Sequence, residues 1–204
     1  MIAALTDFAD LAVLLPVWAL AGLGLAVMGW RRAALAWGCV VPSVLGGMLL
    51  AKLAVTALAG PLTVLLHLRS PSGHTAAAAM VYGGLAGLLL CRTRRQALLI
   101  AGGVAFVIGL SRLALGVHSL MDVLVAAPAG VLGVDVLLRL AGPAPARLRF
   151  RPAVLGTLLI AVLALHGTHL HAEYQIRRWG AFLALTLRHP GPAASRLSLK
   201  GHVL

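Results

Sequence analysis

Long stretches without a single charged residue constrain this chain more than any other feature of its sequence. The run from Leu11 to Met28 contains 18 such residues, and a second run spans Ala33 to Ala51. As a helix, a stretch of about 20 apolar residues matches the hydrocarbon thickness of a bilayer. The mean hydropathy of +0.99 and the 11% of charged residues also lie outside the range of soluble proteins. The sequence therefore predicts an all-α integral membrane protein.

The apolar runs divide the chain into six predicted membrane-spanning helices and a tail. The predicted helices cover residues 11–28, 33–51, 73–90, 96–113, 118–138 and 152–169. We expect residues 1–171 to form one six-helix domain and residues 172–204 to form a basic tail. In the tail, Trp179 and Phe182 fall at helical spacing opposite Arg177 and Arg178, which is typical of an amphipathic helix at a membrane surface.

Basic residues are distributed unevenly between the loops, which predicts a topology. The loops on one side contain Arg31, Arg32, Arg92, Arg94, Arg95, Arg139, Arg147, Arg149 and Arg151. The opposite loops contain only Lys52, Arg69 and Arg112 before the tail. The positive-inside rule makes the arginine-rich side cytoplasmic. We therefore expect a multi-pass protein of a bacterial inner membrane, with Lys52, Arg69 and Arg112 toward the periplasm. Short basic clusters between apolar runs also argue against nucleic acid as a partner, despite the net charge of +12.

Arg69-Ser70-Pro71-Ser72-Gly73-His74 is the first of two polar segments that border apolar runs. Ser72 is placed to be the N-cap of the following helix, whose first backbone N–H groups lie near Gly73. A helix start of this kind is an anion site, and Gly73 lets an anion approach the backbone closely. His74 lies in the first turn, where it is able to donate a proton.

The second polar segment runs from Ser111 to Asp122. His118 and Asp122 are four residues apart, a spacing that places them on one face of a helix. The carboxylate can then hold one imidazole nitrogen and leave the other as a nucleophile. Arg112 supplies a forked donor suited to phosphate, and Gly116 provides a turn between Arg112 and His118.

Together the two segments resemble the second and third signature motifs of the type 2 phosphatidic acid phosphatase superfamily, whose membrane branch has six transmembrane helices. The matching residues are Pro71, Ser72, Gly73 and His74 in one motif, and Ser111, Arg112, His118 and Asp122 in the other. The first motif of the family, a Lys followed by six residues and Arg-Pro, is degenerate here. Lys52 is present, but Ala59 and Gly60 stand where Arg and Pro are expected.

The resemblance implies a role for each site residue. His118 is expected to be the nucleophile that forms a phosphohistidine, Asp122 its orienting partner, and His74 the acid for the leaving group. The expected phosphate ligands are Lys52, Ser72, Gly73 and Arg112. We further predict that Arg69 replaces the arginine absent from the first motif, because no other basic residue occupies positions 53–68.

These expectations define an enzyme that hydrolyses a lipid phosphate or pyrophosphate without a metal or any other cofactor. The substrate classes that the family uses include undecaprenyl pyrophosphate, phosphatidate, phosphatidylglycerol phosphate and lipid A phosphates. Two alternatives remain open at this stage. The same residues suit a lipid phosphotransferase or a lipid A phosphatase, and the degenerate first motif is also compatible with a lipid-phosphate binding protein that has lost catalysis. The sequence does not indicate an oligomeric state.

Overall fold

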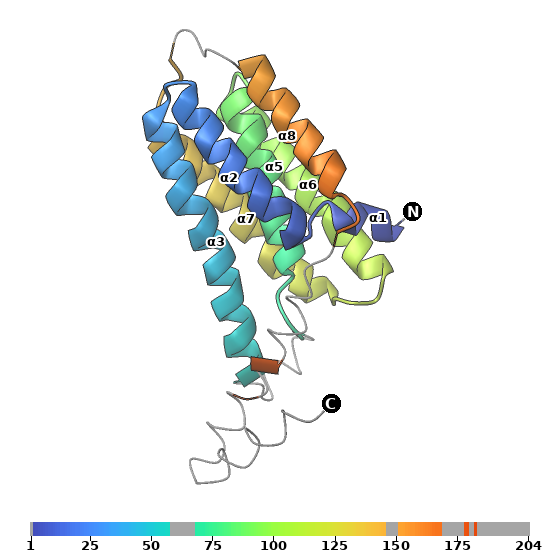
Figure 1. Cartoon of the computed structure of the whole chain (residues 1–204). Helices are drawn as coiled ribbons and strands as arrows, with labels where there is room; N and C mark the ends of the chain where they lie inside the picture. Colours follow the sequence, from blue (N-terminus) through green and yellow to red (C-terminus); the bar gives the residue numbers. More distant parts are fainter. Residues whose placement is uncertain (1, 58–67, 146–150, 169–177, 180–181, 183–204) are drawn as a thin grey trace.

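The computed structural model describes residues 2–57, 68–145, 151–168, 178, 179 and 182. Within them the chain forms only helices: α1 (Ile2–Asp7), α2 (Leu11–Val27), α3 (Arg31–Ala57), α5 (Gly73–Leu89), α6 (Arg94–Ala114), α7 (Leu120–Ala141) and α8 (Arg151–Leu165). The longer six pack as a bundle in which consecutive helices run in opposite directions (Figure 1). The all-α prediction is confirmed for the part of the chain that the structure describes.

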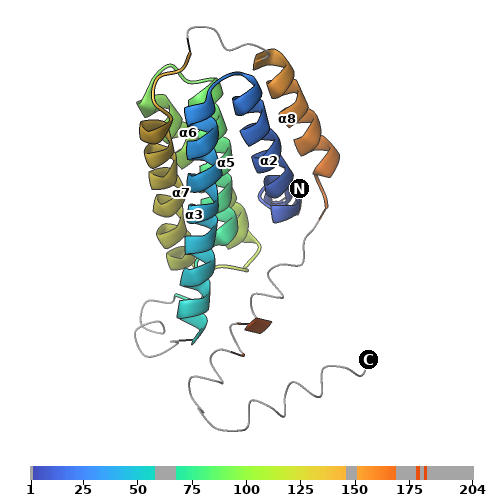
Figure 2. The ribbon, with the colours of Figure 1, turned by 60° about the vertical axis from the view of Figure 1, so that its left-hand side comes forward.

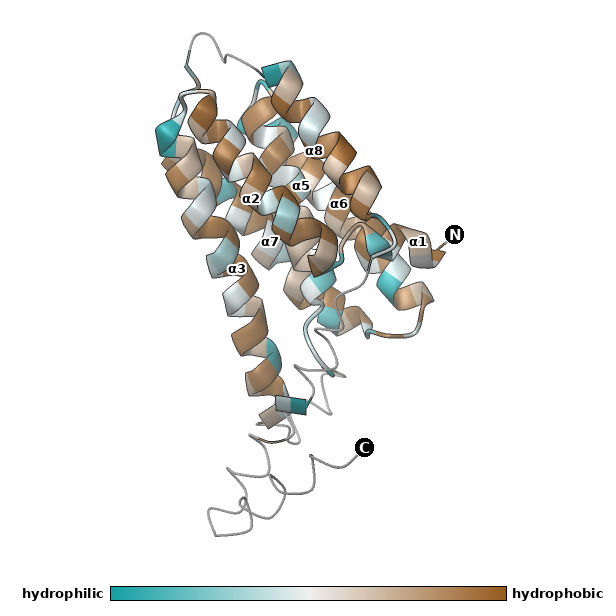
Figure 3. Ribbon diagram, viewed as in Figure 1, coloured by the Kyte–Doolittle hydropathy of each residue, from teal (hydrophilic) through white to brown (hydrophobic). Residues whose placement is uncertain are grey.

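Length and composition allow four stretches of the described residues to cross a membrane. These are Ala4–Val27, Arg31–Ala57, Arg94–Ala114 and Leu120–Ala141. Helices α5 and α8 are present where the sequence predicted spans, but they have only 17 and 15 residues. Apolar residues predominate along the helices (Figure 3), and many of them are exposed: the side chains of Leu35, Phe106 and Ile160 are more than 60% exposed. Apolar exposure on this scale is typical of a surface that faces lipid rather than water.

Helix α5 is the central helix of the bundle and contacts α2, α3, α6 and α7. Its small residues explain how so many neighbours approach it. A Cβ at Gly83 would lie 2.5 Å from the Ala101 Cβ on α6, and a Cβ at Gly84 would lie 2.9 Å from Trp37 on α3. Close packing of small residues is a main source of helix association in lipid.

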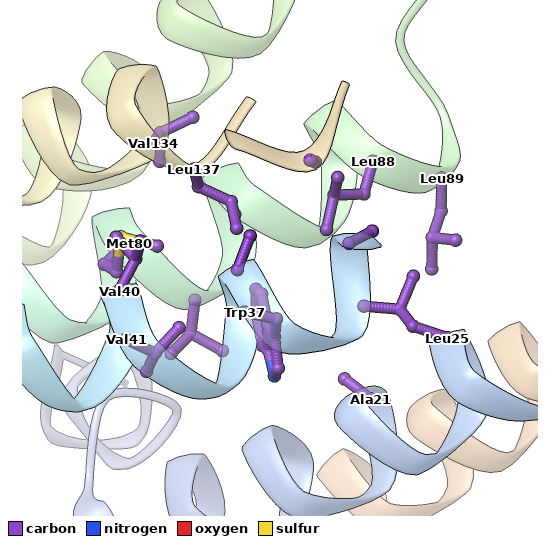
Figure 4. Close-up of a cluster of buried hydrophobic side chains, with 14 of the residues drawn as sticks. Ala21, Leu25, Trp37, Val40, Val41, Met80, Leu88, Leu89, Val134 and Leu137 are labelled. Carbon is purple, nitrogen blue, oxygen red and sulfur yellow. The ribbon is translucent and has the colours of Figure 1, made fainter. Parts of the chain in front are cut away.

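Trp37 of α3 occupies the middle of the largest apolar cluster, where it is completely buried (Figure 4). Its indole Nε1 donates a hydrogen bond of 2.9 Å to the Trp18 carbonyl of α2, which satisfies its one polar group. Met80 of α5 and Leu137 of α7 belong to the same cluster. Helix α8 is peripheral and packs on α2 (Figure 2), where Val154 lies against Gly24.

The arginine-rich loops lie together at one end of the bundle. Helix α3 begins there and α7 ends there: Arg32 Nε donates to the Leu140 carbonyl at 2.7 Å, and Trp30 Nε1 donates to the Ala141 carbonyl at 3.2 Å. These donors satisfy carbonyls that have no partner within the last turn of a helix. Asp135 pairs with Arg94 of α6 and with Arg139 of its own helix, which links α6 to α7. Asp135 therefore has a structural role at this end of the bundle.

Several predicted boundaries need correction. The chain begins with the short helix α1, which the sequence analysis did not predict. Asp10 is the N-cap of α2, and its Oδ1 accepts a hydrogen bond from Ala12 N at 2.8 Å. The fifth long helix starts at Leu120, so His118 precedes it instead of belonging to it. Arg147, Arg149 and nearly all of the tail, with most of its predicted amphipathic helix, lie outside the described residues.

Candidate active site

Four segments that are distant in sequence meet at the end of the bundle opposite the arginine-rich loops. They are the last part of α3, the start of α5 with the residues before it, the end of α6, and the start of α7 with the residues before it (Figures 1 and 2). Every residue that the sequence predicted for the site lies on one of them. These segments lie together because consecutive helices run in opposite directions, so the chain returns to this end of the bundle at each of the four segments.

Asp122 organises the site. Its side chain is completely buried, and Oδ1 accepts hydrogen bonds from the backbone N–H groups of Arg69 at 3.0 Å and Ser70 at 2.8 Å. Its Oδ2 accepts from Ser119 N at 2.9 Å, while Ser119 Oγ accepts from Asp122 N at 3.2 Å. The second pair of bonds is a capping box at the start of α7. One carboxylate therefore fixes the α7 N-terminus and the segment before α5 at the same time.

His118 is held from one side of its ring. Its Nδ1 lies 3.1 Å from the Ser70 carbonyl oxygen and 3.4 Å from Asp122 Oδ2. Both neighbours are acceptors, so Nδ1 carries the proton and Nε2 keeps its lone pair. The predicted His118–Asp122 contact is present, but it arises because His118 precedes the capping box, not because the two share a helix face. Gly116, with a φ of +67°, makes the turn that brings His118 back to the bundle.

The surroundings of His118 favour its neutral form. Burial lowers the pKa of the imidazole below its ordinary value, and the positive charges of Arg112 and Lys52 lower this pKa further. The hydrogen bond and negative charge of Asp122 act in the opposite direction without reversing the result. A neutral imidazole with a free Nε2 is the state that a nucleophilic histidine requires. The positive charges of Arg112 and Lys52 therefore both act on the His118 ring.

The N-terminus of α5 and Lys52 come together at Gly73. A Cβ built on Gly73 would lie 3.5 Å from Lys52 Cε and 3.8 Å from Lys52 Nζ. Lys52 is 96% buried, so its ammonium group is held close to this helix start instead of extending into solvent. The positive end of a helix dipole and an ammonium group at one place form a favourable environment for an anion.

Ser72 occupies the N-cap position of α5, but its side chain makes no capping hydrogen bond. Its Oγ lies 2.8 Å from Thr75 Oγ1, and both residues are completely buried. The predicted N-cap position of Ser72 is therefore confirmed, but its side chain does not make the capping bond. Only one of the two hydroxyls donates within the pair, which leaves one hydroxyl proton for another acceptor.

The remaining predicted residues differ in how far they enter the site. His74 is the second residue of α5 and is half-buried, and Arg112 is half-buried in the last turn of α6. Arg69 is exposed, and its backbone N–H, not its side chain, is the group that contacts Asp122. Its assignment as a phosphate ligand stays a prediction.

Ser111 makes two hydrogen bonds, one within α6 and one to α1. Its Oγ donates to the Ile108 carbonyl at 2.7 Å and lies 3.0 Å from Thr6 Oγ1. Since Ser111 has one hydroxyl proton and uses it for Ile108, Thr6 is the donor in the second bond. The chain of two bonds joins α1 to the end of α6, one residue before Arg112.

Two contributions to the site were missed by the sequence analysis. The capping box of Ser119 and Asp122 has a recognisable pattern, Ser followed three residues later by an acidic residue, and it was available in the sequence. The Ser70 carbonyl, which is the nearer acceptor of His118 Nδ1, has no such signal. Any residue provides a carbonyl, so only the tertiary structure identifies this one.

Comparison with known proteins gives one match. A family model described as the PAP2 superfamily matches residues 17–143. This range contains α3, α5, α6 and α7, most of α2, and every predicted site residue from Lys52 to Asp122. No curated protein and no solved structure matches the chain.

Proposed function

The chain belongs to the PAP2 superfamily, whose members are phosphatases, and on this premise we propose that it hydrolyses a lipid phosphate or pyrophosphate within a membrane. The observation that carries the proposal is the state of His118. Its Nδ1 is held by Ser70 and Asp122, its pKa is lowered by burial and by Arg112 and Lys52, and its Nε2 keeps a lone pair. This combination suits in-line attack on phosphorus.

In the first step His118 Nε2 attacks phosphorus, and the bond from phosphorus to the leaving oxygen breaks. His74 donates a proton to that oxygen, which leaves as an alcohol or a lipid phosphate. In the second step water attacks the phosphohistidine, returns a proton to His74 and releases inorganic phosphate as the P–N bond breaks. Two displacements at one phosphorus restore the starting enzyme.

Positive charge at the site has the task of stabilising the equatorial oxygens of the transition state. Lys52, Arg112 and the first backbone N–H groups of α5 supply it in the proposed mechanism, with Ser72 as a further donor. Lys52 Nζ lies beside Gly73, which supports this role. Cationic side chains then do the work that a metal ion does in other phosphoryl-transfer sites, so we expect activity to survive chelators.

Arg69 differs from the other proposed phosphate ligands because its side chain is exposed. If its guanidinium contacts the phosphate, Arg69→Ala is expected to lose about 2–4 kcal/mol of transition-state stabilisation, and Arg69→Lys to recover little of it. The measurement is kcat/KM on a short-chain lipid phosphate. A change of less than about threefold in Arg69→Ala would leave Lys52 and Arg112 as the cationic ligands.

The apolar outer surface and the four sufficiently long helices support a multi-pass membrane location for the site. A site at the ends of membrane helices meets lipid phosphates at headgroup level, which favours undecaprenyl pyrophosphate, phosphatidate, phosphatidylglycerol phosphate or a lipid A phosphate as substrates. The arginine-rich opposite end supports an outward, periplasmic orientation of the site in a bacterial inner membrane.

The decisive experiment is release of inorganic phosphate from a panel of these four lipids by the purified protein in detergent, with and without EDTA. We expect turnover of at least one lipid, no effect of EDTA, inhibition by vanadate, and no turnover by His118→Ala with an unchanged circular dichroism spectrum. Wild-type rates in His118→Ala would exclude the phosphohistidine. Transfer of phosphate to an added lipid alcohol instead of water would identify a transferase, and lipid binding without turnover would identify a binding protein.

A further inference from the structure

An apolar groove lies on the side of the bundle between the N-terminal segment, α5 and α6. Its walls are Leu5 and Phe8, Tyr82 of α5, and one face of α6 from Ile100 to Ile108, and its volume is about 460 Å³. The only polar side chain among these is Tyr82, whose hydroxyl is engaged because it donates to the Phe8 carbonyl at 2.7 Å. The groove therefore offers an almost wholly apolar surface, of a size typical of a small-ligand site.

One end of this groove adjoins the candidate active site. Ile108, in its wall, accepts a hydrogen bond from Ser111, and Ser111 is next to Arg112 in the last turn of α6. Leu5, in the opposite wall, precedes Thr6, which donates to Ser111. The Thr6–Ser111 bond thus fixes the two walls to each other at the end nearest the phosphate-binding residues.

From that end the groove follows α6 away from the site. Ile100 is eight residues before Ile108, so the groove extends about 12 Å along the helix, toward the middle of the bundle. Leu5, Ile100 and Val107 are all more than 40% exposed, so the groove is open to the surroundings of the bundle along its length. A lipid with its phosphate at Arg112 has its hydrocarbon in this same direction, away from the headgroup level.

We propose that this groove binds a hydrocarbon chain of the substrate lipid, an inference that rests on the proposed phosphatase function. Position, direction and polarity select this occupant: the groove starts one helical turn from Arg112, runs away from the site, and contains no free polar side chain among the described residues that line it. Binding energy from a non-reacting part of a substrate is able to lower the barrier at the reacting centre. The groove consequently makes the enzyme selective for long-chain over short-chain lipid phosphates.

Two adjacent glycines of α6 provide a matched test. Gly103 lines the groove, Gly102 does not, and a Cβ at either position meets no atom within 4 Å. Gly103→Leu therefore adds a side chain at the groove with room for its Cβ, and Gly102→Leu adds the same side chain on the same helix at a position that does not line the groove. Both changes replace glycine within a helix, so neither is expected to destabilise the protein.

The measurement is kcat/KM of the wild type and both variants on two substrate pairs with matched headgroups. The pairs are dioleoyl and dihexanoyl phosphatidate, and undecaprenyl and farnesyl pyrophosphate. For the headgroup that the wild type accepts, we expect Gly103→Leu to lose about tenfold or more on the long-chain member and less than about twofold on the short-chain member. Gly102→Leu should behave as wild type on both.

Equal rates of wild type and Gly103→Leu on the long-chain substrate would overturn the proposal and indicate that bulk membrane lipid covers the groove. Equal losses on both chain lengths would also overturn it, since they would indicate damage to the site. Failure of the proposed function is a different result, namely no phosphate release by the wild type from any of the four substrates. Turnover of a short-chain substrate by the wild type would show that the phosphatase function is present even where the groove proposal fails.

Discussion

Asp122 makes more hydrogen bonds than a residue that only orients His118 would need. Its two oxygens accept from three backbone N–H groups, of Arg69, Ser70 and Ser119, and Oδ2 also lies near His118 Nδ1. An asparagine has only one acceptor oxygen, so in either orientation its NH2 group faces backbone donors. Asp122 therefore both holds the backbone of the site in place and contacts the His118 ring.

We predict that Asp122→Asn lowers both stability and turnover. Loss of charge-assisted bonds in a buried network should cost about 2–4 kcal/mol of unfolding free energy, and turnover should fall because the Ser70 carbonyl moves away from His118. Thermal unfolding and phosphate release measure the two effects. His118→Ala is the control, because it removes the proposed nucleophile but leaves the three backbone contacts of Asp122. A fully stable Asp122→Asn protein would contradict this view of the residue.

The lowered pKa of His118 predicts the acid side of the pH profile. The proposed nucleophile must be neutral to attack, so kcat/KM should fall only as the pH decreases through a value below the ordinary histidine pKa of about 6.5. Arg112 and Lys52 both lower this pKa, so Arg112→Gln and Lys52→Gln should each move the acid limb to higher pH while reducing the rate.

Ionisation of the substrate phosphate also contributes to such a profile, but it is identical for all variants. The shift between wild type and variant therefore reports the enzyme alone. An acid limb at the same pH in wild type, Arg112→Gln and Lys52→Gln would show that His118 does not titrate in this range.

At the scale of elements, α1 supports the end of α6 that lies at the candidate site. Thr6 donates to Ser111, and the Phe8 carbonyl accepts from Tyr82 of α5, so the N-terminal segment is tied to two helices of the site. Ala9, Ala78 and Ile108 form a small buried cluster beneath these bonds. The position of Arg112 in the last turn of α6 depends on how firmly that turn is held.

Thr6→Val keeps the shape of the side chain and removes its hydroxyl, so it tests whether the Thr6–Ser111 hydrogen bond supports the end of α6. We expect a loss of about 1 kcal/mol in stability and a parallel decrease in kcat and in vanadate affinity, because Arg112 is less well placed for the transition state. Thr6→Ser retains the hydroxyl and should restore both. In an Arg112→Ala background Thr6→Val should have little further effect on kcat. Additive losses in the double variant would show that Thr6 does not act through Arg112.

At the scale of the whole molecule, charge separates the two ends of the bundle. Seven of the arginines predicted to be cytoplasmic lie within the described residues and are found at the end opposite the site, which contains Lys52, Arg69 and Arg112. The asymmetry predicts that the site faces outward.

Cysteine labelling tests this orientation. In a protein whose Cys39 and Cys91 are replaced by alanine, Leu115→Cys should react with a membrane-impermeant thiol reagent added to intact cells, and Arg95→Cys should react only after the cells are opened. Both positions are exposed in loops or at helix ends, so accessibility within the protein is comparable. The opposite labelling pattern would place the chemistry in the cytoplasm.

The sequence by itself determined the helical class, the approximate limits of the six long helices and the candidate residues of the site. Uncharged runs such as Leu11 to Met28 require helices, because a backbone in lipid must satisfy its polar groups internally. The motif residues from Pro71 to His74 and from Ser111 to Asp122 identified the family, which the match over residues 17–143 shows. Each of these signals lies within a short stretch of the sequence, so it can be recognised without the tertiary structure.

Only the tertiary structure decided how the site residues contact one another. The sequence placed His118 and Asp122 on a shared helix face, whereas their contact depends on the Ser70 carbonyl, three backbone N–H groups at Asp122, and a capping box. It did not predict α1 or the Thr6–Ser111 bond, which spans 105 residues. Backbone groups are the same in every residue, and contacts across a bundle depend on how the helices pack. Neither therefore leaves a local pattern in the sequence.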